Sequence, residues 1–129
     1  MMKKSLLALA CAIALPALAA YPEKPVTIVV PFAAGGPTDK VARDLAEVLR
    51  KHLNNQTVII ENVGGAGGTL GAAKVAKAAP DGYTLLLHHI GMATSPALYR
   101  KMPYETLTDF EYLGTSLTMP RYSKSVSVS

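Results

Sequence analysis

A glycine-bearing loop between a buried strand and a helix is the part of this sequence best suited to chemistry. Residues 26–43 read VTIVVPFAAGGPTDKVAR, an apolar β-branched run followed by a loop and the start of a helix. Glycines let a ligand approach the backbone closely, and the amides of a first helical turn have no acceptor within the helix. Such a turn suits a carboxylate or a phosphate. The sequence therefore predicts an anion site here, although spacing alone is equally compatible with a plain strand-to-helix connection.

A second glycine-rich loop lies at residues 64–71, which read GGAGGTLG and again join a strand to a helix. Gly65 and Gly67 match the first two positions of the dinucleotide fingerprint G-x-G-x-x-G, but Leu70 stands at the third. The next strand ends in His88 and His89, where a ribose-binding acid would be expected. The pattern therefore disfavours a dinucleotide site.

Evidence for catalysis or for a metal is weak. Neighbouring histidines in a strand point to opposite faces, and no carboxylate lies near His88 and His89 in the sequence. No combination of serine, histidine and acid indicates a nucleophile. Asp39 is more often a helix cap than a ligand contact at such a position. We predict a protein that is not an enzyme, with no metal and no cofactor.

The pattern of elements predicts an α/β fold with a parallel sheet, because strands alternate with helices. We expect strands at 26–30, 57–60 and 83–87, and a fourth starting at 110–113. Helices are expected at 39–53 and 69–79, and a short one beginning at Ser95 with Pro96 in its first turn. The first helix has an apolar stripe that should face the sheet: Val41, Leu45, Val48, Leu49 and His52.

Residues 1–19 have the pattern of a cleavable signal peptide. Lys3 and Lys4 precede an apolar run at 6–15, and small residues precede the cleavage position. The run is too short to span a membrane. Cleavage would remove Cys11, the single cysteine, and leave eleven basic against nine acidic residues. Without a basic run interleaved with aromatics, nucleic acid is not an expected partner. We expect a periplasmic protein that is not embedded in the membrane.

Several motifs in order resemble one family. PVTIVVPFAAGGPTDKVAR, VIIENVGGAGGTLGAAKVAKAAPDGYTLLL, SPALY and DFEYLG are similar to the start of Bug/TctC-type periplasmic solute-binding proteins of tripartite tricarboxylate transporters. The resemblance implies a type II periplasmic-binding-protein-like fold, of which only the parallel-sheet part of domain 1 is expected here. Residues 20–116 would form that part. Residues 117–129 would be a divergent tail, which could be an alternating edge strand but is expected to be disordered or the product of a shifted reading frame.

The resemblance implies an extracytoplasmic receptor that binds small carboxylates and passes them to membrane permease subunits, with binding impaired by truncation. The ligands would be tricarboxylates, dicarboxylates or acidic amino acids. The implied ligand-binding residues are Phe32, Ala33, Ala34, Gly35, Gly36, Thr38 and Asp39 in the first loop, Gly65, Ala66 and Gly67 in the second, and His89 in a third. Two alternatives stay open: a nucleotide-binding α/β enzyme fragment, and a small exported structural or interaction domain.

Overall fold

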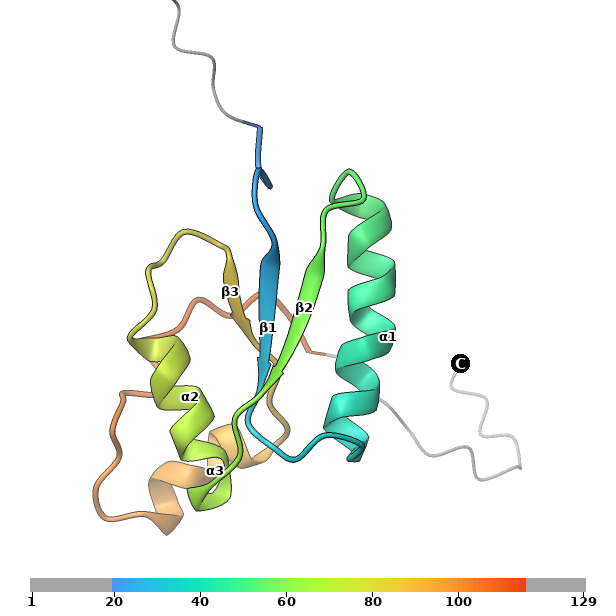
Figure 1. Ribbon diagram of the computed structural model, residues 1–129. Helices are drawn as coiled ribbons and strands as arrows, with labels where there is room; N and C mark the ends of the chain where they lie inside the picture. The colour runs from blue at the N-terminus through green and yellow to red at the C-terminus, as the bar shows by residue number, and fades with distance from the viewer. Residues whose placement is uncertain (1–19, 116–129) are drawn as a thin grey trace, which may run out of the picture.

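Three parallel strands form the centre of the fold (Figure 1). The computed structural model describes residues 20–115. The strands are β1 (Val26–Val30), β2 (Val58–Asn62) and β3 (Thr84–Leu86), in the order β2-β1-β3. Both pairs run parallel. The predicted α/β class with a parallel sheet is therefore confirmed.

The central strand β1 is buried because it has a neighbour on each side. Four of its five residues are buried. In the register of the sheet, Ile28 lies opposite both Ile60 of β2 and Leu85 of β3. Residues opposite one another point to the same face, so these three side chains belong to one apolar layer.

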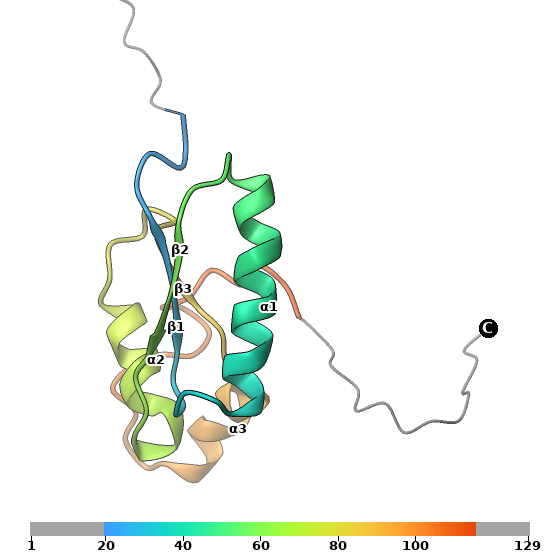
Figure 2. The ribbon, with the colours of Figure 1, turned by 45° about the vertical axis from the view of Figure 1, so that its right-hand side comes forward.

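Helices cover both faces of the sheet. Helix α1 (Pro37–His52) lies on one face, and α2 (Thr69–Ala76) lies on the other (Figure 2). A short 3₁₀ turn, η1 (Ala66–Gly68), precedes α2, and α3 (Gly91–Leu98) follows β3. One buried cluster joins β1 to α1 through Ile28, Val30, Ala42 and Ala46. A second joins α2, α3 and the segment after α3 through Ala72, Ala73, Met92 and Tyr104.

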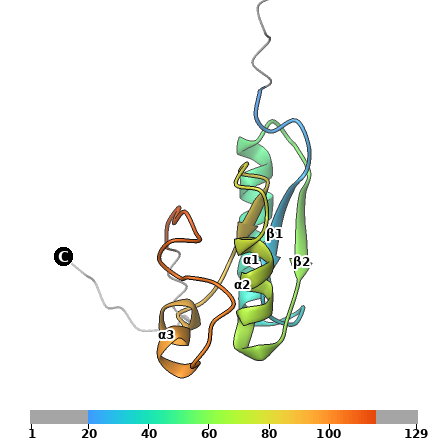
Figure 3. The same cartoon turned by 90° about the vertical axis from the view of Figure 1, so that its left-hand side faces the viewer.

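The three helices begin at the same end of the sheet, where the strands have their carboxyl ends (lower part of Figure 1). Figure 3 shows α3 and the segment that follows it set to one side of β1 and β2. No helix within residues 20–115 is long and apolar enough to cross a membrane. The loops that precede the helices are thus gathered at one edge, which is where open α/β sheets bind ligands.

The buried face of α1 differs from the predicted stripe. Ala42 and Ala46 contact the sheet, and Leu49 of the predicted stripe packs against the same cluster, whereas Leu45 is 36% exposed and Val48 is 52% exposed. Small side chains let the helix lie close to the strands, so the longer residues beside them are left at the flank of the contact. Asp39 does not cap the helix, because the helix begins earlier, with Gly36 as N-cap and a proline in the first turn.

Two predictions for the last part of the described chain were wrong. Helix α3 begins at Gly91, so Pro96 lies inside it and not in its first turn. Residues 110–113 form no strand in the described structure. The ring of Phe110 instead packs edge-on against Tyr104, with centroids 5.4 Å apart, and joins the α2–α3 cluster.

Gly71 allows α2 to approach the end of β1 closely. A Cβ atom at this position would lie 2.7 Å from Pro31 Cβ and 2.7 Å from the Val63 carbonyl oxygen. Neither atom belongs to the far end of a flexible side chain. Any larger residue at position 71 must therefore move α2 away from the strand.

We expect Gly71→Ala to destabilise the chain by about 1–3 kcal/mol, the usual cost of overpacking a close contact. Urea unfolding followed by circular dichroism measures this. Gly114→Ala is the matched control, because a Cβ at that position has no neighbour within 4 Å. Equal stability of the two variants would show that the helix–strand contact relaxes freely.

Candidate functional site

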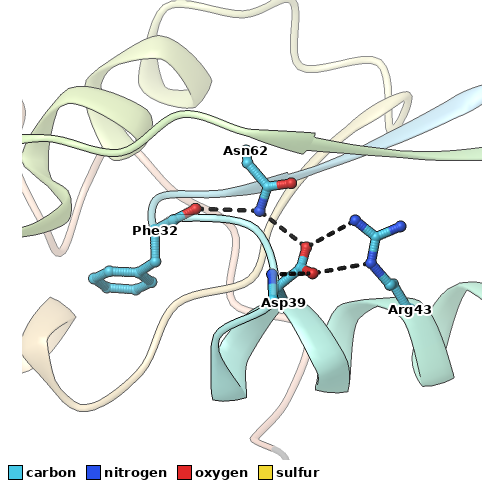
Figure 4. A network of polar contacts seen from close by, with 5 residues as sticks. Phe32, Asp39, Arg43 and Asn62 are labelled. Carbon is cyan, nitrogen blue, oxygen red and sulfur yellow. Dashed lines mark hydrogen bonds and ion pairs between the residues drawn. The ribbon is translucent and has the colours of Figure 1, made fainter.

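A buried carboxylate organises the first loop (Figure 4). Asp39, in the first turn of α1, is 2% exposed. Its Oδ2 accepts the Gly35 amide at 2.9 Å and Arg43 Nε at 2.9 Å. Its Oδ1 accepts Arg43 Nη2 at 3.2 Å and Asn62 Nδ2 at 2.9 Å. The two oxygens thus accept four hydrogen bonds, which fills their capacity.

These bonds determine the chemistry of Asp39. Hydrogen bonds from Arg43, Gly35 and Asn62 lower the pKa of its carboxyl from 3.8 to about 2. The same Asn62 amide group also donates to the Phe32 carbonyl at 3.1 Å. Asp39 therefore ties both the loop and the end of β2 to α1. With its acceptor positions filled by protein donors, it acts in this structure as a positioning residue.

Several amides of the first loop have no protein acceptor. Among the described residues, the N–H groups of Ala33, Ala34, Thr38 and Asp39 donate to no protein group. The Gly35 amide is occupied by Asp39, and the Gly36 amide makes a long bond of 3.4 Å to the Ala33 carbonyl. Fewer amides of this loop are therefore free than the number of residues predicted to bind a ligand there. Gly35 instead shapes the loop, because its φ of 83° is a backbone conformation that favours glycine.

The second loop has a comparable supply of free amides. Gly65, Ala66, Gly67 and Gly68 all have positive φ, a conformation that favours glycine. The Gly68 amide donates to the Gly65 carbonyl at 3.0 Å, whereas those of Gly65, Ala66 and Gly67 have no protein acceptor in the described residues. A Cβ on Gly67 would lie 2.3 Å from the Tyr99 hydroxyl, so Tyr99 closes one side of this loop.

Phe32 brings the three loops together. Its ring stacks on His89, with centroids 4.3 Å apart and planes 16° apart, and meets His88 edge-on at 5.2 Å. A Cβ on Gly68 would lie 3.1 Å from Phe32 Cζ. A Cβ on Gly64 would lie 3.7 Å from the Ala33 nitrogen. The first loop is therefore held between the loops that follow β2 and β3.

The two histidines occupy different environments. His88 is half-buried, and its Nδ1 lies 3.0 Å from the His89 carbonyl oxygen, which can only accept. Its Nε2 is buried without a partner in the described residues, and burial lowers its pKa. His89 is exposed, and its Nδ1 lies 2.8 Å from the Gly91 amide. His88 thus supports the loop, while His89 lies at its surface.

The structure brings all the sequence-predicted site residues to one edge of the sheet, on the segments that follow β1, β2 and β3: Thr38 and Asp39 lie in the first turn of α1, Ala66 and Gly67 lie in η1, and the others lie in the connecting loops. Their contact with a ligand remains a prediction. Three supporting residues were missed: Asn62, Arg43 and Tyr99. Arg43 had a signal in the sequence, because it stands four residues after Asp39 on the predicted helix. Asn62 had a weaker one, as a polar residue shortly after the apolar run of the second strand. The described residues contain no group of three or more acidic, histidine or cysteine side chains that could hold a metal ion.

Lowering the pH should decrease the free energy of unfolding through protonation of Asp39. Its pKa is about 2 in the folded chain against an ordinary 3.8. The ionised carboxylate therefore stabilises the fold above about pH 4, and this contribution is lost as the pH falls toward about 2. We expect urea unfolding to show a steeper loss of stability over that range in the parent chain than in Asp39→Asn. Asp44→Asn, an exposed change on the same helix, should keep the parent slope. Parallel slopes for all three would contradict this role of Asp39.

Comparison with known proteins places this arrangement in a family. The family model for the tripartite tricarboxylate transporter family receptor, TctC, matches residues 41–126. That match reaches into residues 117–126, which the sequence analysis assigned to a divergent tail and which lie outside the described residues. The proposed domain boundaries stay predictions.

Individual relatives agree. A UPF0065 protein of Agrobacterium vitis is 57% identical over 100 residues, covering 78% of this chain and 29% of its own length. The solved structure of the periplasmic binding protein BugD is 60% identical, with a TM-score of 0.68, over 70% of this chain and 30% of that one. MatC from Rhodopseudomonas palustris, solved with bound malate, is 50% identical, with a TM-score of 0.67, over 70% of this chain and 31% of MatC.

The chain spans about 30% of the length of these relatives. The shared fold confirms the predicted likeness to periplasmic binding proteins. The family is one of transport receptors, which agrees with the prediction that the chain is not an enzyme. By its sequence and by its fold, this chain belongs to the TctC family of tripartite tricarboxylate transporter receptors.

Proposed function

We propose that this chain forms one wall of a receptor site for small carboxylates at the carboxyl edge of its sheet. The observation that carries the proposal is the group of free amides on two adjacent loops, from Ala33, Ala34 and Thr38 in one and Gly65 to Gly67 in the other. Amides at a helix start bind anions through their N–H groups and through the helix dipole.

The donors in this proposed site are neutral. No lysine or arginine occurs in residues 31–39, 63–72 or 87–95. The nearby Arg43 already pairs with Asp39. An anion would therefore be held by backbone hydrogen bonds, which are stronger when the acceptor is charged. A carboxylate, with two oxygens in one plane, can use donors from both loops.

The relatives support a dicarboxylate as the ligand class. MatC was solved with malate, and it shares half of its matched sequence with this chain. Because the proposed donors in the described residues are neutral, we expect these residues to bind a dicarboxylate weakly.

The cellular location and the protein partner that we propose are those of the family. BugD is a periplasmic binding protein, and residues 1–19 have the pattern of an export signal. We propose a periplasmic location and delivery of the ligand to membrane permease subunits of a tripartite transporter. The small-carboxylate ligand and the permease subunits are the two proposed partners.

Titration with malate, followed by amide chemical shifts in nuclear magnetic resonance spectra, tests the site. We expect shifts at Ala33, Ala34, Thr38 and Gly65–Gly67 with a dissociation constant near or above about 1 mM, equivalent to about −4 kcal/mol. Such an affinity fits a site whose donors are neutral backbone amides.

The controls separate this function from its rivals. Malamide, with neutral amides in place of carboxylates, should leave these residues unshifted, and ATP should do so as well. Shifts with ATP but not malate would favour the nucleotide-binding alternative. No response to any ligand at 50-fold the expected constant, on the order of tens of millimolar, would leave a structural domain as the better description.

A further inference from the structure

The His89 imidazole has a tautomer that its surroundings select. The Gly91 amide donates to its Nδ1 at 2.8 Å. A ring nitrogen that accepts a hydrogen bond carries no proton, so the neutral ring must hold its proton on Nε2. The start of α3 thereby sets which edge of the ring is a donor.

The position of the ring is set as well. It stacks on Phe32 at 4.3 Å. A Cβ on Gly91 would lie 2.5 Å from His89 Cε1, so the ring also occupies the space that glycine leaves at the start of α3. The side chain is exposed, and its Nε2 donates to no protein group among the described residues. A free, oriented donor thus lies beside the first loop.

His88, the neighbour of His89, has a structural role only. Its Nε2 is buried, and a Cβ on Gly68 would lie 2.8 Å from it. Its Nδ1 is occupied by the His89 carbonyl. Neither nitrogen of His88 is accessible to a ligand. Of the two neighbours, only His89 offers a polar atom to the site.

We infer that His89 Nε2–H donates to a second acceptor group of the ligand, so that it determines the preference for dicarboxylates over monocarboxylates. The inference rests on the proposed function, since it requires one carboxylate to be held by the amides of the first two loops. It adds a specificity-determining side chain that acts as a neutral donor and not through a positive charge. Phe32 and Gly91 are the groups that position it.

Three substitutions distinguish the effect of the Nε2–H donor from the effect of the stacked ring. His89→Gln places an amide N–H near the position of Nε2. His89→Asn keeps an acceptor for the Gly91 amide but has no donor at that position. His89→Phe keeps a ring to stack on Phe32 and removes both polar atoms. His52→Asn, on the exposed end of α1, is the control.

The measurement compares malate with butyrate by amide chemical shifts. We expect the Asn and Phe variants to bind malate about tenfold more weakly, the loss of one hydrogen bond to a charged acceptor. Butyrate binding should stay unchanged in every variant. The Gln variant and the His52 control should keep the malate preference.

A second measurement does not depend on any ligand. Long-range nitrogen–proton spectra of the parent chain should show the His89 proton on Nε2, and a proton on Nδ1 would overturn the inference. The inference would also be overturned if the Asn and Phe variants kept the parent preference for malate over butyrate while the loop amides still responded to malate. If the amides of Ala33, Ala34 and Thr38 respond to neither acid, the proposed function fails and the inference fails with it.

Discussion

One carboxylate and its four hydrogen bonds hold the carboxyl edge of the sheet in shape. Asp39 is enclosed by an amide of its own loop, an arginine of its own helix and an asparagine at the end of the neighbouring strand. Burying a charge is costly unless it is fully hydrogen-bonded, and here each lone pair has a donor. Because the Asn62 amide group also donates to the Phe32 carbonyl, the loop, α1 and β2 are coupled through a single side chain.

A second constraint is the close approach of three loops around one aromatic ring. Phe32 contacts both histidines after β3, and the glycines after β2 leave the room that it needs. The glycines therefore serve two purposes. At Gly68 the absent side chain makes space for Phe32 and His88, and at Gly71 it makes space for the end of β1. The third glycine of a dinucleotide fingerprint has a similar packing role, although here it stands one residue later.

Much of the fold could be predicted, because its signals are local. The β-branched run of β1 predicted a strand with the observed bounds, and the alternation of elements predicted a parallel sheet. The face that α1 buries was harder to predict from the sequence. Helix and sheet lie so close together that the small side chains of Ala42 and Ala46 are buried instead of longer ones. The start of α3 depends on a bond from the Gly91 amide to a histidine ring, which no periodicity reveals. Free amides were expected at the first loop and are found there, whereas those of the second loop were not expected. The role of Asn62 was not expected, because it depends on a carboxylate 23 residues away in sequence. The pairing of Arg43 with Asp39 is local, at i and i+4 of one helix, and could have been predicted.

The neutrality of the backbone donors has a consequence for how the proposed site would respond to pH. Backbone amides do not change their charge with pH, and the one carboxylate that orients them stays ionised down to about pH 2. An anion site that relied on histidine charge would lose its attraction in alkaline surroundings. Backbone donors of this kind keep their charge constant wherever the chain stays folded, so the amides of the proposed site would respond to pH only through the ionisation of the ligand.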